Sequence, residues 1–177
     1  MSRIIKGDDK KMNGGFEIVK ESLPVNWYFY SPETVPEGDF DLIVDTTNFK
    51  EGKKSVKFLI RKCTSVGGRY SPGLFNNFNA KPDETYKVSF WIMNQGCDLK
   101  IRVGSQGEKA GTGRDETILK TADTIAEWKY IEYNYKMPSK VDNIRFELNI
   151  LKSGTFWIDD IKIEGINDKS EMTTWGS

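Results

Sequence analysis

Residues 155–165 read Thr-Phe-Trp-Ile-Asp-Asp-Ile-Lys-Ile-Glu-Gly, and this stretch decides how the fold closes. In a regular β-strand every second side chain points to the same face. The residues of one parity are Trp157, Asp159, Ile161 and Ile163. Three of these four are apolar, which predicts a buried face with a carboxylate in it. An unpaired buried carboxylate is costly, so Asp159 is expected to have a cation, a metal or strong hydrogen-bond donors beside it.

The same two-residue alternation recurs along most of the chain. In the clearest segment, 85–93, apolar side chains take every second position from Tyr86 to Ile92. The other segments predicted as strands are 16–19, 39–45, 55–61, 99–103, 128–135, 143–151 and, with a turn, 117–126. Turn-forming residues separate them, and no window shows a sustained helical period. The predicted fold class is therefore all-β, a sandwich of two antiparallel sheets or a barrel.

Length and charge limit the classes of function. A chain of 177 residues suits one domain with a full core. Its 26 basic and 26 acidic residues cancel, which leaves no electrostatic footprint for nucleic acid or an anionic membrane. Apolar runs are too short to span a bilayer, and the lysine-rich start lacks the apolar core of a signal peptide. The predicted organisation is a flexible leader at 1–12, a domain at 13–166 and a polar tail at 167–177.

The chain contains no histidine, although it is rich in aromatic residues. It therefore lacks the usual general base near neutral pH and the usual nitrogen ligand of zinc, which disfavours an enzyme without excluding one. Cys63 and Cys97 have no metal-type spacing. They are either one disulfide or two free thiols.

A cluster of four aromatics, Trp27-Tyr28-Phe29-Tyr30, lies in a segment with three prolines that is predicted to be a loop, 23–36. Exposed loop aromatics are candidates for ligand contact. The alternative is that they cap one end of the sandwich, and the sequence leaves this choice open.

Five motifs, taken in order, resemble a known family. They are Asn-Gly-Gly-Phe-Glu at 13–17, Glu-Gly-Lys-Lys-Ser-Val at 51–56, Thr-Tyr-Lys-Val-Ser-Phe-Trp at 85–91, Trp128, and Phe-Trp-Ile-Asp-Asp-Ile at 156–161. Together they resemble the galactose-binding-like jelly rolls among carbohydrate-binding modules, close to families four, nine and twenty-two. The resemblance spans about 13–166. It implies a jelly-roll sandwich and a non-catalytic module that binds polysaccharide or oligosaccharide.

The resemblance also implies a structural calcium that ties the first strand, the turn at 51–54 and the last strand together. Carried over by position, Glu17 and Asp159 would be carboxylate ligands, Glu51 a third, and the carbonyl of Lys53 or Lys54 a fourth. Calcium takes six to eight oxygen ligands, which suits carboxylates and carbonyls from remote segments. The alternative is that Asp159 pairs with a lysine or caps a turn.

The sugar site is predicted among side chains that oppose the core parity and so face solvent. Trp91 is a large indole at such a position, where a sugar ring can stack on it through C–H groups. Arginine with glutamate or asparagine supplies paired hydrogen bonds to adjacent hydroxyls. Family twenty-two implies, in addition, an arginine and a loop aromatic after the third strand and alternate residues of the penultimate strand. The predicted carbohydrate-binding residues, on one concave sheet face, are Trp91, Arg61, Tyr70, Arg102, Arg145, Glu147 and Asn149.

The chain departs from the family twenty-two pattern at several of these positions. Tyr70 stands where tryptophan is usual, and Arg145 and Glu147 replace tyrosines, which puts xylan in doubt. Three arginines on one face favour an acidic glycan as an alternative. A further alternative is a purely solvated face whose charges form salt bridges while a loop covers Trp91.

Two other functions stay open at this stage. One is a jelly-roll polysaccharide lyase or hydrolase, with Glu132 and Glu147 as the carboxylate pair or Tyr70 and Tyr130 as bases. The other is a protein-interaction or assembly domain that uses the aromatic cluster. The leading expectation is a module that works outside the cell or at its surface, linked to a catalytic domain or working beside one, with no nucleic-acid or membrane partner.

Overall fold

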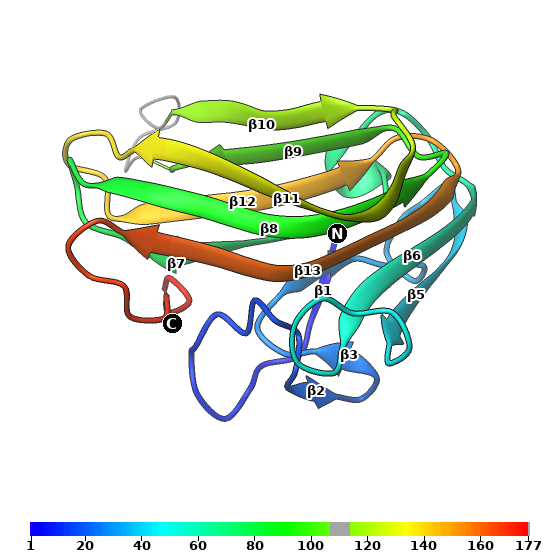
Figure 1. Cartoon of the computed structure of the whole chain (residues 1–177), viewed down its shortest axis with the longest axis horizontal. Helices are drawn as coiled ribbons and strands as arrows, with labels where there is room; N and C mark the ends of the chain where they lie inside the picture. The colour runs from blue at the N-terminus through cyan, green and yellow to red at the C-terminus, as the bar shows by residue number, and fades with distance from the viewer. Residues whose placement is uncertain (107–113, 177) are drawn as a thin grey trace.

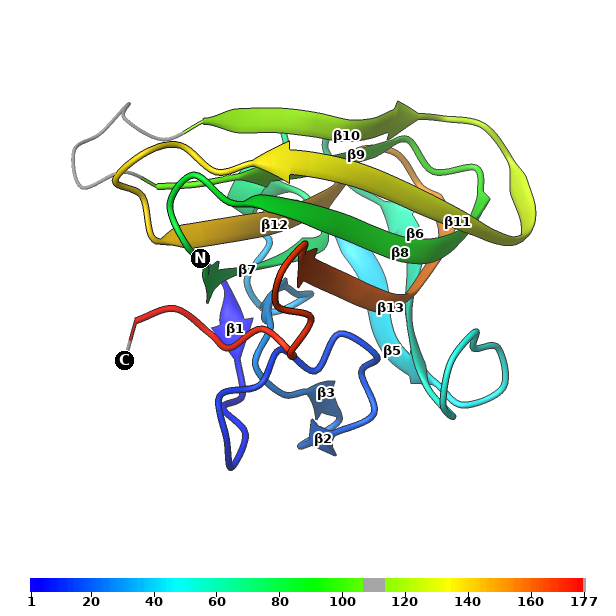
Figure 2. The ribbon, with the colours of Figure 1, turned by 60° about the vertical axis from the view of Figure 1, so that its left-hand side comes forward.

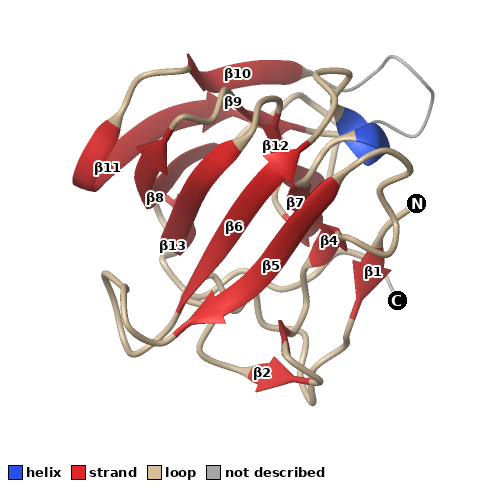
Figure 3. Cartoon of the chain, turned by 90° about the vertical axis from the view of Figure 1, so that its right-hand side faces the viewer, coloured by secondary structure: helices blue, strands red, loops and turns tan. Residues whose placement is uncertain are grey.

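The computed structural model describes residues 1–106 and 114–176, which form two antiparallel sheets packed face to face (Figures 1 and 3). The six-stranded sheet runs in the order β1 (Arg3–Ile4), β4 (Tyr28–Tyr30), β7 (Gly73–Asn79), β12 (Asn143–Ile150), β9 (Leu99–Gly104), β10 (Asp115–Thr121). The five-stranded sheet runs in the order β11 (Ile125–Lys136), β8 (Thr85–Gln95), β13 (Gly154–Gly165), β6 (Ser55–Lys62), β5 (Asp39–Asp45). A small hairpin of β2 (Val19–Lys20) and β3 (Leu23–Pro24) and the 3₁₀ turn η1 (Gly68–Tyr70) complete the described elements. The predicted two-sheet antiparallel β-sandwich is confirmed.

The core lies between the sheets, where the apolar parity of each strand meets its counterpart. Val88, Phe90 and Ile92 of β8 are fully buried, as the alternation predicts. Trp27 is at one end of this core, with the rings of Phe78 and Phe146 edge-on to it at centroid distances of 5.3 and 6.0 Å. Such tilted contacts add to the free energy gained by burying the rings. Three residues of the cluster, Tyr28–Tyr30, therefore form a strand rather than a loop, and Trp27 and Phe29 point inward.

The β13 strand departs from regular alternation, which contradicts the prediction that Trp157, Asp159 and Ile161 share a face. Asp159 lies opposite Trp91 of β8, whereas Lys162 lies opposite Ser89, so β13 carries one extra residue. This β-bulge includes Asp160, whose φ is 54°. Before the bulge Phe156 and Ile158 point inward, and after it Ile161 and Ile163 do. Trp157 therefore points outward.

Both ends of the described chain are built into the fold, so the predicted boundaries at 13 and 166 fall inside the folded unit. β1 pairs with β4, with Arg3 opposite Phe29. Lys11 forms a bridge with Thr173, and Thr174 forms one with Phe78 of β7. Figure 2 shows the C-terminal segment running beside β1. Residue 177 lies outside the described residues.

β11 is one of the two edge strands of the five-stranded sheet and pairs along one side only, with β8, while β5 is the other edge. It is 12 residues long, and more than half of its residues are exposed. Cys63 and Cys97 are both free thiols. Within the described ranges, no helix is long and apolar enough to cross a membrane.

Candidate functional site

A buried carboxylate organises the outer face of the six-stranded sheet. Glu147 of β12 is only 6% exposed, although its parity points it away from the core. Its Oε1 accepts hydrogen bonds from Nε and Nη2 of Arg145, at 3.0 and 2.8 Å. Its Oε2 lies 3.0 Å from Nη2 of Arg102 and accepts a 3.2 Å bond from the Tyr30 hydroxyl. A buried charge with partners on every side is held in one position.

An aromatic platform lies beside this carboxylate. Tyr28 of β4 and Phe75 of β7 stack with their rings 4.9 Å apart and almost parallel, and both are partly exposed. The guanidinium of Arg145 lies 4.2 Å from the centre of the Phe75 ring, so it joins the platform to Glu147. Burial and the nearby Glu147 raise the pKa of Tyr30 well above its ordinary value. This hydroxyl therefore stays a proton donor to Glu147.

Sequence reasoning missed Phe75 and left Tyr28 undecided between ligand contact and capping. β4 is only three residues long, so its alternation was too brief to be read as a strand. The available signal was the parity of the cluster itself, because Trp27 and Phe29 are buried while Tyr28 points outward.

A hollow of about 190 Å³ opens at the β9–β10 side of this face. The side chains that line it include Arg102, Arg145, Glu147, Gln106 and Asp115. The Nε of Arg102 is buried and has no hydrogen-bond partner among the described residues. Because an unsatisfied buried donor is costly, a water or a ligand oxygen is the natural partner for this group.

Asn149 and Tyr70 lie at the opposite end of β12 from this hollow. The Asn149 side chain accepts a 3.1 Å hydrogen bond from the N–H of Gly68 and donates a 3.0 Å bond to its carbonyl. These bonds fix the η1 turn over the end of the strand. Tyr70 projects from this turn, is 40% exposed and has the guanidinium of Arg69 over its ring. Four of the predicted residues, Arg102, Arg145, Glu147 and Asn149, thus share one face, and Tyr70 lies at its end.

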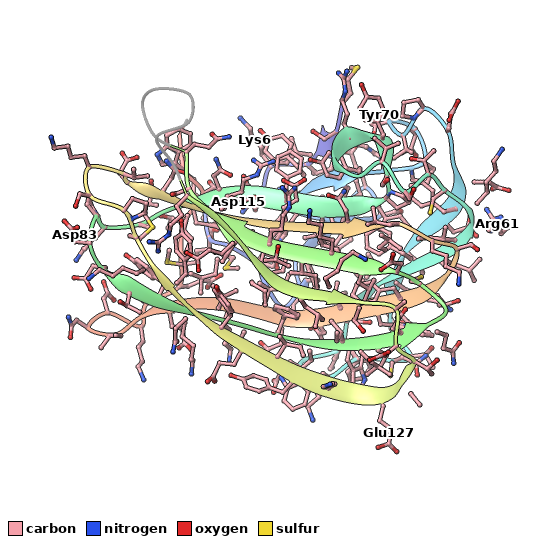
Figure 4. The ribbon with its side chains drawn as sticks, turned by 90° about the horizontal axis from the view of Figure 1, so that it is seen from above. Lys6, Arg61, Tyr70, Asp83, Asp115 and Glu127 are labelled. Atoms are coloured by element: carbon pink, nitrogen blue, oxygen red, sulfur yellow. The ribbon has the colours of Figure 1, made fainter. Side chains whose placement is uncertain are left out.

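The prediction that Trp91 and Arg61 join this face is wrong. Trp91 belongs to β8 and Arg61 to β6, so both point outward from the five-stranded sheet, on the far side of the sandwich. Arg61 forms salt bridges with Asp39 and Asp41 of β5. In Figure 4 Arg61 lies at the far end of the sheets, well away from Asp115 of β10. Parity alone separates inward from outward and cannot tell which sheet a strand joins.

The residues predicted to bind calcium meet at the turn between β5 and β6, which folds over the outer face of β13. Both oxygens of Glu17 accept peptide N–H groups, from Lys53 at 2.8 Å and Lys54 at 3.0 Å. Asp159 is fully buried and accepts three, from Lys50, Glu51 and Asp160, at 2.8, 2.9 and 2.7 Å. Burial raises the pKa of Asp159 to about 6, and these N–H groups oppose that rise.

This arrangement does not fit a calcium site as the ligands are placed. A calcium ion would have to bind the carboxylate oxygens of Glu17 and Asp159, but these oxygens already accept hydrogen bonds from backbone N–H groups. The third predicted carboxylate ligand, Glu51, is exposed to solvent. Across residues 1–106 and 114–176, no three His, Cys, Asp or Glu side chains are grouped to hold a metal ion. The strong donors expected around Asp159 are therefore backbone N–H groups, and calcium stays a prediction.

Chelation tests calcium directly. Because Glu17 and Asp159 already have N–H partners, we expect EDTA to leave the Tm within about 1 °C of its value with added calcium. The measurement is a thermal melt followed by circular dichroism, with and without chelator. A fall of about 4 °C or more, equal to roughly 1–2 kcal/mol in a chain of this size, would show that a divalent cation stabilises the folded chain.

The structure also separates the residues considered for catalysis. Glu132 lies on β11 and Glu147 on β12, in different sheets and on opposite outer faces. They cannot flank one glycosidic bond, which a hydrolase requires. Tyr70 and Tyr130 are also on opposite sides of the sandwich. Tyr130 lies opposite Trp91 on the outer face of the five-stranded sheet, whereas Tyr70 lies at the end of the six-stranded sheet.

Comparisons with known proteins agree with this geometry. The family model for a carbohydrate binding domain matches residues 11–154, whereas curated proteins give no match. The xylan-binding domain of family 22 from Paenibacillus barcinonensis Xyn10C is 13% identical with a TM-score of 0.57, over 92% of this chain and 94% of that one. The N-terminal modules of Clostridium thermocellum endo-1,4-β-D-xylanase 10B, solved with xylohexaose, are also similar. Their sequence identity is 16% and their TM-score is 0.57, over 92% of this chain and 28% of that one.

A carbohydrate-binding module of family 4 is similar as well, with 12% identity and a TM-score of 0.56, over 86% of this chain and 97% of that one. At such identities the likeness shows the fold, and it confirms the predicted jelly roll. The modules of this family are non-catalytic, which agrees with the expectation that this chain is not an enzyme. Because the family model covers most of the chain, the protein belongs to the family of carbohydrate-binding modules that this model describes.

Proposed function

We propose that this module binds a neutral polysaccharide, with xylan as the first candidate, on the outer face of the six-stranded sheet. The observation that carries the proposal is Glu147, a carboxylate buried on an outward position between two arginines. The cluster is a fixed set of donors and acceptors beside the Tyr28–Phe75 platform. Sugar recognition needs this combination, because ring C–H groups stack on aromatics while hydroxyls pair with polar groups.

Charge pairing favours a neutral ligand over the acidic glycan that the arginines alone suggested. Arg102 is paired with both Asp115 and Glu147, and Arg145 is paired with Glu147. No unpaired positive charge is left on these two side chains to attract a uronate or sulfate. The xylan named for the family 22 neighbours supports the choice of first candidate.

Replacing Tyr28 with alanine tests the platform. We expect the affinity for xylohexaose to fall roughly tenfold, because the ring loses its stacking contact with the sugar. Isothermal titration calorimetry measures the change. The matched control is Tyr130→Ala, which removes the same side chain from the opposite sheet and should leave the affinity unchanged. A loss on Tyr130→Ala with none on Tyr28→Ala would place the site on the other face.

We also propose that the module works outside the cell beside a polysaccharide-degrading catalytic domain. Carbohydrate-binding modules of this kind are typically extracellular, and the Clostridium thermocellum neighbour carries its module in one chain with a catalytic one. Screening xylan, mannan and β-glucan with the purified chain would identify the polymer. Release of reducing ends from any of them would contradict a purely binding role.

A further inference from the structure

The outer face of the five-stranded sheet carries a second aromatic surface, unrelated to the Glu147 cluster. Three neighbouring strands supply it: Tyr130 from β11, Trp91 from β8 and Trp157 from β13. Tyr130 and Trp91 lie opposite each other with ring centroids 5.1 Å apart. Trp157 lies opposite Met93, two residues from Trp91 on the same face, which makes the two indoles diagonal neighbours. We call these three rings the aromatic row.

The row is held in place and remains partly open to solvent. The Trp157 indole donates a 2.9 Å hydrogen bond to Asp45, and Tyr130 donates one of 2.9 Å to Glu132. Both tryptophans are partly exposed, and Tyr130 is 42% exposed. Such fixed, partly exposed rings form a stacking surface at low entropic cost.

Two lysines give the aromatic row its charge. The Lys50 ammonium lies 4.2 Å from the centre of the Trp91 ring, and the Lys57 ammonium lies 5.3 Å from that of Trp157. Among the described residues neither has a carboxylate partner, whereas Lys87 on this face is paired with Glu132 and Glu164.

Two buried carboxylates of this sheet, Asp45 and Asp159, already accept other hydrogen bonds. Asp45 accepts N–H groups from Thr47, Asn48 and the Trp157 indole, and Asp159 accepts its three peptide N–H groups. Two positive charges thus stand over aromatic rings with no anion assigned to them.

We propose that the aromatic row is a second glycan-binding site, specific for acidic polysaccharides that contain uronate. A uronate ring offers C–H groups to an indole and a carboxylate to an ammonium, so it matches both halves of this surface. A neutral polysaccharide has no carboxylate and would leave both lysines without an anionic partner. The two faces of the sandwich therefore bind chemically different glycans, a neutral one at Glu147 and an acidic one at Trp91.

Polygalacturonate and its fully methyl-esterified form are the probes, because esterification removes the charge and keeps the ring. We expect calorimetry to show binding of the acid form only. The double variant Lys50→Gln, Lys57→Gln should weaken it at least tenfold and reduce the dependence on salt concentration. Its matched control is Lys6→Gln, Lys10→Gln, which makes the same change in net charge on the N-terminal segment and should bind as the unchanged protein does.

Trp91→Ala should weaken polygalacturonate binding to a similar extent and leave xylohexaose binding unchanged. Its control is Trp175→Ala, which removes an exposed indole from the C-terminal segment. The proposal would be overturned if the esterified polymer bound as tightly as polygalacturonate. It would also be overturned if the double variant Lys50→Gln, Lys57→Gln bound polygalacturonate as tightly as the unchanged protein. So would a parallel loss of xylohexaose affinity in these variants, because the two polymers would then share one surface.

Discussion

Replacing Glu147 with glutamine is expected to weaken xylohexaose binding by roughly 30- to 150-fold, the largest effect of any single change on this face. Hydrogen bonds to a charged group in a buried site contribute about 2–3 kcal/mol, and losing that free energy of binding corresponds to this fall in affinity. Glutamine has nearly the same shape but carries an N–H₂ group where Glu147 has an acceptor. Because guanidinium groups of Arg102 and Arg145 face both oxygens of Glu147, that N–H₂ would oppose a donor in either orientation.

The fold is expected to survive this substitution with a lower Tm. Removing one partner of a buried ion pair costs about 3–5 kcal/mol, which a domain of ordinary stability tolerates at 25 °C. Near-ultraviolet circular dichroism checks that the variant is folded before the titration. The matched control is Glu132→Gln on β11, a glutamate on the opposite face, which should bind xylohexaose normally. If the two variants bind equally well, Glu147 is a purely structural residue.

Gly14→Ala is expected to lower the free energy of unfolding by about 3 kcal/mol or more and the Tm by roughly 6–12 °C. A Cβ at this position would lie 1.8 Å from the carbonyl oxygen of Ile161, a backbone atom that has no room to move away. The turn at Gly14 would move away from β13, and the 2.9 Å bond from the N–H of Ile161 to the Gly14 carbonyl would break. Chemical denaturation with urea measures the loss.

The neighbouring glycine is the control for this prediction. An alanine Cβ at Gly15 would meet nothing closer than Cγ of Glu17, at 3.8 Å. Gly15→Ala should therefore stay within about 1 kcal/mol of the unchanged protein. Equal destabilisation by both substitutions would mean that the 13–17 segment resists any added side chain, and that the contact with Ile161 has no special part in it.

Much of the fold could be predicted from the sequence because side-chain alternation is a local property of each strand. Long strands such as β8 and β12 show it over many residues, and their buried faces were predicted correctly. The bulge at Asp160 could not be predicted, because the residues on either side of it fit a regular strand equally well. β7 was missed for another reason, since asparagines occupy three of its seven positions and interrupt the apolar pattern.

The candidate site was predicted only in part, because its assembly depends on which strands become neighbours. Arg145 and Glu147 are two residues apart on one strand, so their proximity could be read from the chain. Phe75 and Tyr28 reach the same face through pairings of strands that are far apart in sequence. The covering of Asp159 by the turn at 50–51 is a similar long-range contact, and no local pattern encodes it.

The long free edge of β11 bears on how such modules behave when crowded on an insoluble polymer. An uncovered edge strand can pair with the edge of another chain and start aggregation. Glu127, Lys129, Glu132 and Lys136 place exposed charges of both signs along this strand. Its pairing with β8 is also irregular between Ile125 and Lys129, which bends the edge away from a flat template. The module thus carries its own protection against self-polymerisation at high local density.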